Sequence, residues 1–269
     1  MKPGRSLRRR TLRLGAIVCA ALLHFGGAAR AADWTVGANV GNVPWEFQDE
    51  AGRFVGFEVE LVSKAAEALG KSVEFVNIPF NGLFPAVQSG RVGMAISSIT
   101  ITPARLQSLS FTQPYYDSDQ SLAVAARGGP AGLDAMRGKI VGVDTASTGD
   151  QWATANRAKY GFADIKRYEG LAPAMLDLQA GRIDGYISDI PAVQYYIRDK
   201  PQFRVADRIP TGERYGVMLQ KGSPLAAQLD AQISEMKRNG FLAGLHQKWF
   251  GAPPAPGSST VTVLPMPVP

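Results

Sequence analysis

The stretch SSITITPAR, residues 97–105, combines hydroxyl side chains with a single arginine close to a proline. A proline directly after Thr102 is typical of the first turn of a helix, so the hydroxyls end a strand and Arg105 belongs to the helix that follows. The planar guanidinium of an arginine can meet a carboxylate through two parallel hydrogen bonds. These residue types could therefore bind an anion, and an arginine on an exposed helix face is the alternative.

Polar residues also follow two strands in the second half of the chain. In DTASTGD, residues 144–150, Ser147 and Thr148 stand at the start of a helix, where free backbone N–H groups and the helix dipole favour an anion. The same residues could simply cap that helix. Asp189 ends the strand GYISD and could likewise cap the next helix.

Residues 1–31 have the pattern of a secretory signal peptide. A basic start without acidic residues leads into the apolar stretch 14–25, and the sequence ARA at 29–31 puts small residues at the two cleavage-recognition positions. The apolar stretch is too short to span a membrane as a helix, and an uncleaved anchor is the alternative. We therefore expect a periplasmic protein that loses this segment.

The basic charge of the chain is concentrated in the predicted signal peptide. Of 29 basic residues seven lie in residues 1–31, where no acid occurs, so the remainder has 22 basic against 23 acidic residues and a formal charge of −1. Nucleic-acid binding loses its support accordingly. Cys19 and His24 leave with the signal and only His246 remains. We expect no disulfide, metal site, cofactor or histidine general base.

From Trp34 onward short apolar strands alternate with amphipathic helices, which is typical of α/β proteins with largely parallel sheets. The pattern then restarts in a second, similar unit. Two linkers, 121–129 and 215–222, imply two lobes between which the chain crosses twice, and such proteins commonly close around a ligand. The pattern predicts strands near 34–40, 72–78, 92–98, 138–144 and 185–189, and helices near 56–70, 82–90, 149–161, 172–181 and 226–250.

The last stretch, residues 252–269, is rich in proline. Six prolines in GAPPAPGSSTVTVLPMPVP exclude a stable helix or an interior strand. We expect a disordered tail, with an extended recognition segment as the alternative.

Four stretches form a specific combination over most of residues 34–251. They are GFEVEL, FPAVQSGRVGMAISSITITPARLQSLSFTQPYY, LQAGRIDGYISD and YGVMLQKGSPL with MKRNGFLAGLHQKWFG. With them the chain resembles the extracytoplasmic solute-binding proteins of polar amino-acid ABC transporters, family 3. The resemblance implies a type II periplasmic-binding-protein-like fold, in which two hinge strands join the lobes around a ligand cleft. It implies lobe 1 at 32–123 and 217–251 and lobe 2 at 124–216.

The resemblance also implies roles for individual residues. Arg105, with Ser98 and the backbone of Thr100, would hold a ligand carboxylate, and Thr148 would contact the same group from the other lobe. Asp189 would hold the ligand's ammonium. The aromatic residues Phe80 and Trp45 would line the cleft, although either could be core, and Asn42 stands where the family usually places a stacking ring. The remaining candidates, near the ligand's side chain, are Asn39, Asn42, Asp144, Ser147 and Ser188.

None of these side-chain contacts is cationic, which disfavours an acidic ligand. A buried Asp144 favours a cationic or amide-bearing side chain, because an unpaired carboxylate is costly to desolvate; a solvated loop aspartate is the alternative. The expected function is capture of a polar or basic L-amino acid, glutamine or one like Arg, Lys or His, by a monomer that delivers it to a membrane permease. A cyclohexadienyl or arogenate dehydratase on the same scaffold is the competing hypothesis, with Asp144 as its candidate acid.

Overall fold

The strands build two five-stranded sheets and one short ribbon within the residues that the computed structural model describes, 32–269 and Met1. The predicted signal peptide, with Cys19 and His24, lies outside the described residues apart from Met1. Residues Ala32–Pro269 form one compact unit. None of the helices in this described part is long and apolar enough to cross a membrane.

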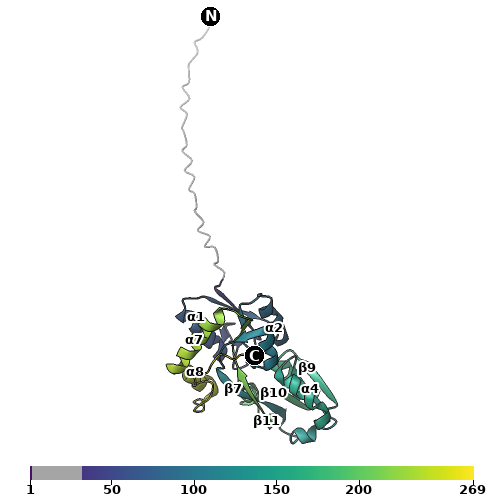
Figure 1. The fold of residues 1–269 in the computed structure, drawn as a ribbon. Helices are drawn as coiled ribbons and strands as arrows, with labels where there is room; N and C mark the ends of the chain where they lie inside the picture. Colours follow the sequence, from purple (N-terminus) through teal and green to yellow (C-terminus); the bar gives the residue numbers. More distant parts are fainter. Residues whose placement is uncertain (2–31) are drawn as a thin grey trace. The chain divides into compact units, whose positions relative to one another are not determined.

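The first sheet takes strands from both ends of the described chain. Its order is β4 (Val73–Asn77), β1 (Trp34–Ala38), β5 (Met94–Ala95), β12 (Met218–Gln220) and β6 (Leu109–Phe111). β1 is parallel to β4 and β5, whereas β12 is antiparallel to β5 and β6. The sheet and its helices form the first lobe, visible around α1 in Figure 1; the helices are α1 (Phe57–Ala68), α2 (Phe80–Gln88), α3 (Pro103–Ser108), α7 (Leu225–Arg238) and α8 (Phe241–Phe250).

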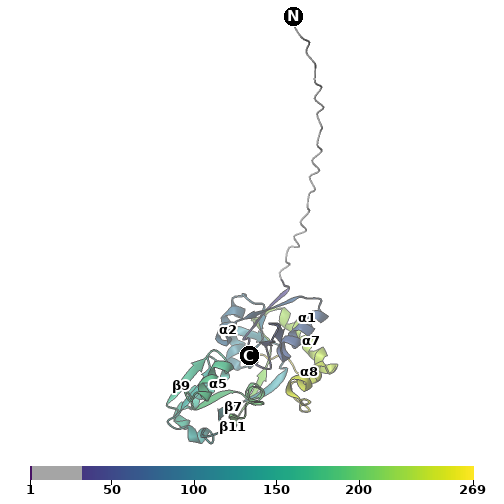
Figure 2. The ribbon, with the colours of Figure 1, turned by 180° about the vertical axis from the view of Figure 1, so that it is seen from behind.

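The second sheet has the order β11 (Phe203–Tyr215), β7 (Tyr116–Ala125), β10 (Gly185–Asp189), β8 (Ile140–Asp144) and β9 (Asp164–Tyr168). The last three strands are parallel, and β7 is antiparallel to both of its neighbours. This sheet forms the second lobe, seen from behind in Figure 2, and both sheets are mixed. The predicted two-lobed α/β class is confirmed. Its helical elements are η1 (Leu133–Met136), α4 (Thr148–Tyr160), α5 (Leu171–Gln179) and α6 (Ile190–Ile197).

The chain crosses between the lobes at two places that lie side by side. The first crossing joins β6, which ends at Phe111, to β7, and the second joins β11 to β12 between Tyr215 and Met218. The paired segments Tyr116–Ser118 and Glu213–Tyr215 run antiparallel at this point. All of β7 belongs to the second sheet, so the first crossing precedes the expected linker 121–129, whereas the second falls inside 215–222.

Trp45 lies in the core of the first lobe and not in the cleft, contrary to the expectation that it lines the ligand site. The side chain is fully buried and makes edge-to-face contacts with Phe57, Tyr116 and Tyr215, whose ring centroids lie 5.5, 4.7 and 5.4 Å away. The chain passes closely over it at Gly56, where a Cβ atom would meet the Trp45 carbonyl oxygen at 2.2 Å and where φ is 136°. Only glycine fits at this position. In the sequence, the short ribbon of β2 (Phe47–Gln48) and β3 (Phe54–Val55) lies between Trp45 and Gly56.

The expected disorder of residues 252–269 is wrong for this structure, because the segment folds back onto the molecule. It has no helix or strand, as its prolines require, yet Ser259 and Thr260 are each only 2% exposed. The backbone N–H of Ser259 donates to Asp117 Oδ2 at 2.7 Å, and the N–H of Leu264 donates to Gln113 Oε1 at 3.0 Å. Asp117 lies in β7, so the segment reaches the crossing strands.

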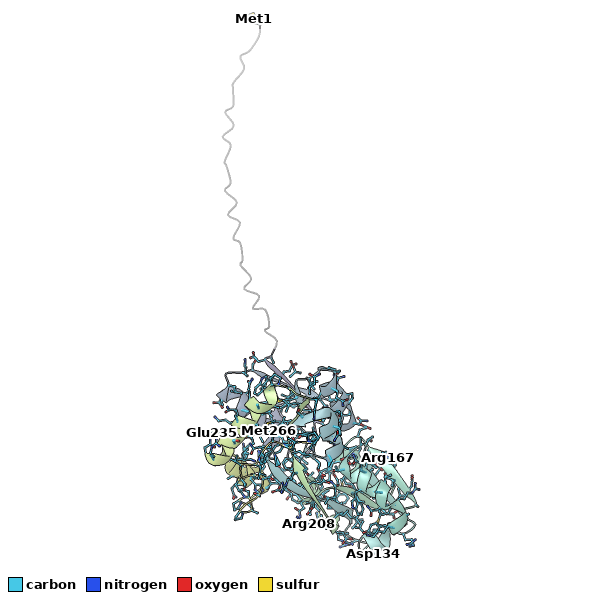
Figure 3. The ribbon with its side chains drawn as sticks, in the orientation of Figure 1. Met1, Asp134, Arg167, Arg208, Glu235 and Met266 are labelled. Atoms are coloured by element: carbon cyan, nitrogen blue, oxygen red, sulfur yellow. The ribbon has the colours of Figure 1, made fainter. Side chains whose placement is uncertain are left out.

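A buried lysine fixes the same segment. Lys237 of α7 is 5% exposed and donates to the carbonyl oxygens of Thr262 and Pro114, at 2.9 and 2.7 Å, and to Gln113 Oε1 at 2.8 Å. Burial lowers the pKa of Lys237 to about 8. Met266 also packs against the main hydrophobic cluster of the molecule, and it appears on the side of the first lobe in Figure 3. Absence of regular structure, which the prolines predict, is thus compatible with an ordered, docked backbone.

Candidate functional site

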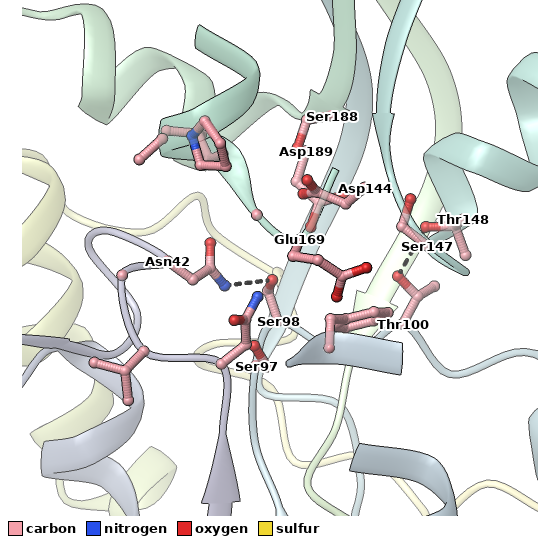
Figure 4. A pocket seen from close by; sticks show the side chains of 18 of the residues that line it. Asn42, Ser97, Ser98, Thr100, Asp144, Ser147, Thr148, Glu169, Ser188 and Asp189 are labelled. Carbon is pink, nitrogen blue, oxygen red and sulfur yellow. Dashed lines mark hydrogen bonds between the residues drawn. The ribbon is translucent and has the colours of Figure 1, made fainter. Parts of the chain in front are cut away.

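A pocket lies between the two lobes and is lined from both. Figure 4 shows Asp144, Ser188 and Asp189 on one side and Asn42, Ser97 and Ser98 on the other, with Thr100 facing Thr148. The lining brings together ten of the twelve predicted site residues; only Arg105 and Trp45 are missing from it. The full lining is Asn39, Val40, Gly41, Asn42, Phe80, Ser97, Ser98, Thr100, Gln120, Asp144, Ser147, Thr148, residues 169–173, Ser188 and Asp189.

The hydroxyl run after β5 forms part of the first-lobe wall in a strained backbone conformation. Ser98 has φ of 44°, a left-handed conformation that a residue with a Cβ atom rarely adopts. Its N–H donates to Glu58 Oε1 at 2.8 Å, and its hydroxyl oxygen accepts from Asn42 Nδ2 at 3.0 Å. Such strain is kept where surrounding contacts fix the backbone, and it is common at ligand sites.

Two buried acids support this wall from behind. Glu46 and Glu58 are both fully buried; Glu46 Oε1 accepts from Ser97 Oγ at 2.5 Å and from Asn42 Nδ2 at 3.2 Å, and Glu58 accepts from the Tyr115 hydroxyl. Burial and the neighbouring Glu58 carboxyl raise the pKa of Glu46 well above its usual value. Burial also raises the pKa of Glu58. The wall therefore rests on two buried carboxyl groups, of which Glu46 holds a proton more firmly than an exposed glutamate does.

Arg105 lies one layer behind the pocket surface. Thr102 caps α3 by accepting from the Arg105 N–H at 3.2 Å, and Pro103 opens the helix as predicted. The guanidinium donates to the carbonyl oxygens of Thr100, at 2.7 Å, and of Ala146 in the other lobe, at 3.4 Å. It stacks on Phe84 and is only 8% exposed. Arg105 is thus a buried cation that touches both lobes, not a surface arginine.

Burial lowers the pKa of Arg105 to about 10, and the nearby carboxylates of Glu213 and Asp189 act in the opposite direction. The guanidinium therefore keeps its charge at neutral pH and attracts negative groups behind the Thr100 wall. Its separation from the pocket surface by Thr100 places it where its field acts on a ligand through one layer of protein.

The start of α4 forms the facing wall in the second lobe. Ser147 is the N-cap: its hydroxyl oxygen accepts from the Asp150 N–H at 3.0 Å, which is the capping alternative, and it also lines the pocket. Thr148 Oγ1 lies 3.5 Å from Thr100 Oγ1, across the gap between the lobes. Ala146, which directly precedes Ser147, has φ of 63°, so its backbone is strained in the same way as that of Ser98.

Asp144 ends β8 and presents an unsatisfied carboxylate. Tyr186 donates its hydroxyl proton to Asp144 Oδ2 at 2.8 Å, whereas Asp144 Oδ1 is buried and has no hydrogen-bond partner. Burial raises the pKa of Asp144 to about 6, and the Tyr186 hydroxyl and the nearby backbone N–H of Gly170 act in the opposite direction. An acceptor of this kind calls for a donor from a ligand, because a buried unpaired oxygen is costly.

Asp189 ends β10 and faces the same pocket. It occupies the N-cap position of α6, yet its side chain makes no capping hydrogen bond there. It accepts instead from Gln120 Nε2 of β7. Burial, followed by the charge of Glu213, raises the pKa of Asp189 to about 8. The Asp189 carboxyl therefore holds a proton more firmly than a free aspartate does, and an approaching cation would favour its ionised form.

Three polar residues around the pocket were not predicted from the sequence. Gln120 and Glu169 line it, and Glu213 lies just behind Thr100 and Thr148. Gln120 lies in the continuous polar run 117–121 of β7 and Glu213 lies between Gly212 and Arg214 of β11, so neither stretch has an alternation that marks one residue as facing a pocket. Among the described lining residues there is no lysine and no arginine. The site surface is acidic and rich in acceptors.

Comparison with known proteins gives consistent matches. The model of the bacterial extracellular solute-binding proteins, family 3, matches residues 34–252. The chain is 29% identical over 213 residues to the putative ABC transporter arginine-binding protein 2 of Escherichia coli strain K12, covering 77% of this chain and 86% of that protein. It is 29% identical over 213 residues to the L-cystine-binding protein TcyJ of the same strain, with 78% and 79% covered. An ancestral arginine-binding protein, solved bound to arginine, has a TM-score of 0.76 and 30% identity over 81% of this chain and 98% of that one.

Proposed function

Because the chain belongs to the bacterial extracellular solute-binding proteins of family 3, we propose that it captures a basic L-amino acid between its lobes and delivers it to a membrane permease. Arginine, lysine or a ligand of similar charge fits this proposal. Glutamine, which offers an amide in place of the positive charge, is the weaker candidate within it. Location in the periplasm after removal of residues 1–31 is part of the same proposal.

The observation that carries the proposal is the unpaired carboxylate oxygen of Asp144 in a pocket without a basic wall residue. A guanidinium or ammonium at the ligand's side-chain end would donate to this oxygen and relieve the cost of its burial. An acidic ligand would instead bring a further negative charge beside Asp144 and Glu169. Like charges that lie within one small, partly buried pocket repel each other strongly.

The other end of the ligand would lie between Asp189 and the Thr100 wall. Asp189 would accept from the ligand's ammonium, and its proton would leave as the ammonium arrives. The ligand's carboxylate would lie toward the start of α4, where Ser98 and Ser147 offer hydroxyl groups and Arg105 supplies a positive field from behind. This arrangement assigns binding roles to Ser98, Arg105, Ser147, Thr148 and Asp189.

A thermal-shift screen of the signal-free protein against the common amino acids and cystine tests the proposal. Ligand at a thousandfold excess over its Kd adds about 4 kcal/mol of stability. We expect arginine, lysine or another cationic amino acid to give the largest rise in Tm. A screen in which only glutamate and aspartate raise the Tm would contradict the proposal.

The proposal is for binding without catalysis. A dehydratase on the same scaffold would need an acid such as Asp144 or Asp189 to protonate a leaving hydroxyl. Incubation of the purified protein with prephenate or arogenate, followed by detection of the aromatic product, distinguishes the two functions. Turnover that disappears in Asp189→Asn would favour the enzyme.

A further inference from the structure

Glu213 accepts the hydrogen bonds from threonine hydroxyls that a ligand carboxylate would otherwise accept. It stands near the end of β11, where the chain is about to cross between the lobes, and is 6% exposed. Its Oε2 accepts from Thr100 Oγ1 at 2.7 Å and from Thr148 Oγ1 at 3.0 Å, one hydroxyl from each lobe. A threonine hydroxyl has a single proton, so both hydroxyls turn their lone pairs toward the pocket.

Gln120 is committed in the same way. Its side-chain N–H₂ group donates to Glu213 Oε1 at 3.0 Å and to Asp189, while its Oε1 is buried without a partner. The amide nitrogen has two protons, and it also lies 3.3 Å from Thr148 Oγ1, so these three acceptors share both protons. At this end of the pocket the Thr100 and Thr148 hydroxyls therefore offer oxygen lone pairs, which suit an ammonium better than a carboxylate.

Resting on the proposed function, we propose that Glu213 supplies from within the chain the carboxylate that an α-amino acid brings as a ligand. The pocket then also binds organic dications that lack a carboxylate, with a guanidinium or ammonium group at each end. For such an amine, Glu213 already fills the position between the Thr100 and Thr148 hydroxyls and already balances the charge of Arg105.

The charges around the pocket agree with this assignment. Among the described residues around the pocket, the buried cation is Arg105; Glu213 and Asp189 act on its charge, and its guanidinium makes its hydrogen bonds to backbone carbonyl oxygens. A dication brings one positive group for Asp144 and one for Asp189. A basic amino acid brings the same two groups together with a carboxylate, which must share Arg105 with Glu213. The added carboxylate therefore contributes little to affinity in this protein.

Isothermal titration calorimetry with L-arginine and agmatine isolates that contribution, since the two molecules differ by the carboxylate alone. We expect the unaltered signal-free protein to bind agmatine within about tenfold of L-arginine. In Glu213→Gln the negative charge that balances Arg105 is lost, and the neutral amide oxygen competes less strongly than a carboxylate for the Thr100 and Thr148 protons. Agmatine should then bind more weakly and L-arginine more tightly, and the ratio of their Kd values should move toward L-arginine by about tenfold or more.

Glu235→Gln, on the exposed side of α7, is the matched control and should leave the ratio unchanged. Two results overturn the inference and leave the proposed function standing. One is that agmatine binds the unaltered protein more than about tenfold more weakly than L-arginine does. The other is that folded Glu213→Gln has the same ratio of Kd values as the unaltered protein. Should neither ligand bind, the proposed function itself fails for these cations, and the inference fails with it. The comparison of ligands on the unaltered protein decides the matter even if the variant does not fold.

Discussion

Asp144→Asn should stabilise the ligand-free protein while weakening its binding of a cationic ligand. The wild-type carboxyl is half-buried at the pocket wall, and one of its oxygens has no donor. An asparagine of the same shape can still accept from the Tyr186 hydroxyl, but it carries no charge that must be taken out of water. The same substitution removes the partner that we assign to the ligand's side-chain cation.

The pKa of Asp144 sets the size of the stability gain. Below pH 3.8 the carboxyl is protonated in both the folded and the unfolded chain and contributes nothing to stability. As the pH rises from 3.8 to about 6, the unfolded carboxyl ionises first, so the free energy of unfolding falls. Above about 6 the full cost is about 3 kcal/mol. Solvent at the pocket side screens part of it, and about 1–3 kcal/mol is the expected gain in the variant at neutral pH.

Thermal melting of the ligand-free proteins between pH 4 and pH 8 measures this gain. At neutral pH the variant should melt higher by about 2–12 °C, since about 1 kcal/mol moves the Tm of a chain of this size by about 2–4 °C. The two curves should converge near pH 4. Wild type and variant should share the further decline toward pH 8 that Asp189 causes, because its pKa is raised in the same direction.

Asp177→Asn is a control of opposite sign. Asp177 accepts from Lys166, Tyr168 and Arg182, and these partners hold its pKa well below the usual value. Its replacement should therefore lower the Tm at neutral pH and leave ligand affinity almost unchanged. The reasoning is refuted if Asp144→Asn lowers the neutral-pH Tm, or if it raises the Tm equally at pH 4. In calorimetry the affinity of Asp144→Asn for L-arginine should be lower than that of the wild type by about tenfold or more.

Three further outcomes follow from the same contacts. Arg105→Ala should weaken L-arginine binding by about 2–5 kcal/mol in calorimetry, because the ligand's carboxylate would then meet the Glu213 carboxylate without the cation that they share, and an unchanged Kd would exclude Arg105 from the site. Trp45→Ala should lower the free energy of unfolding by about 3–5 kcal/mol in urea titrations; a loss below about 1 kcal/mol would contradict its place in the core. Truncation after Ala252 should lower the Tm, since Lys237 and Asp117 lose buried partners worth about 2–4 kcal/mol, and an unchanged Tm would show that residues 253–269 are not docked.

The alternation of strands and helices predicted the two lobes because each element is long enough to show its period. The helix at 56–70 and the strands near 34–40 and 72–78 match α1, β1 and β4 closely. Trp45 could not be placed in the same way, since the short segment between β1 and α1 has no periodicity that distinguishes core from cleft.

The site was partly predictable because strand ends and helix starts meet at one edge in α/β sheets. Thr100, Thr148 and Asp189 were found on that basis together with the family resemblance, and the structure brings them to one pocket. Glu213 was not found, because its role depends on the register of β11 against β7, which no local pattern encodes. The docked end of the chain was missed because proline content reports on helices and strands and is silent about side-chain acceptors such as Asp117.

The position of β12 determines when the first sheet can be completed. β12 lies between β5 and β6, so these two strands have no common neighbour until Met218–Gln220 has been supplied. The second sheet draws all its strands from one continuous stretch, Tyr116–Tyr215. During synthesis from the amino end, the second lobe can therefore assemble first. The first lobe keeps an open gap in the middle of its sheet until its last strand has been made.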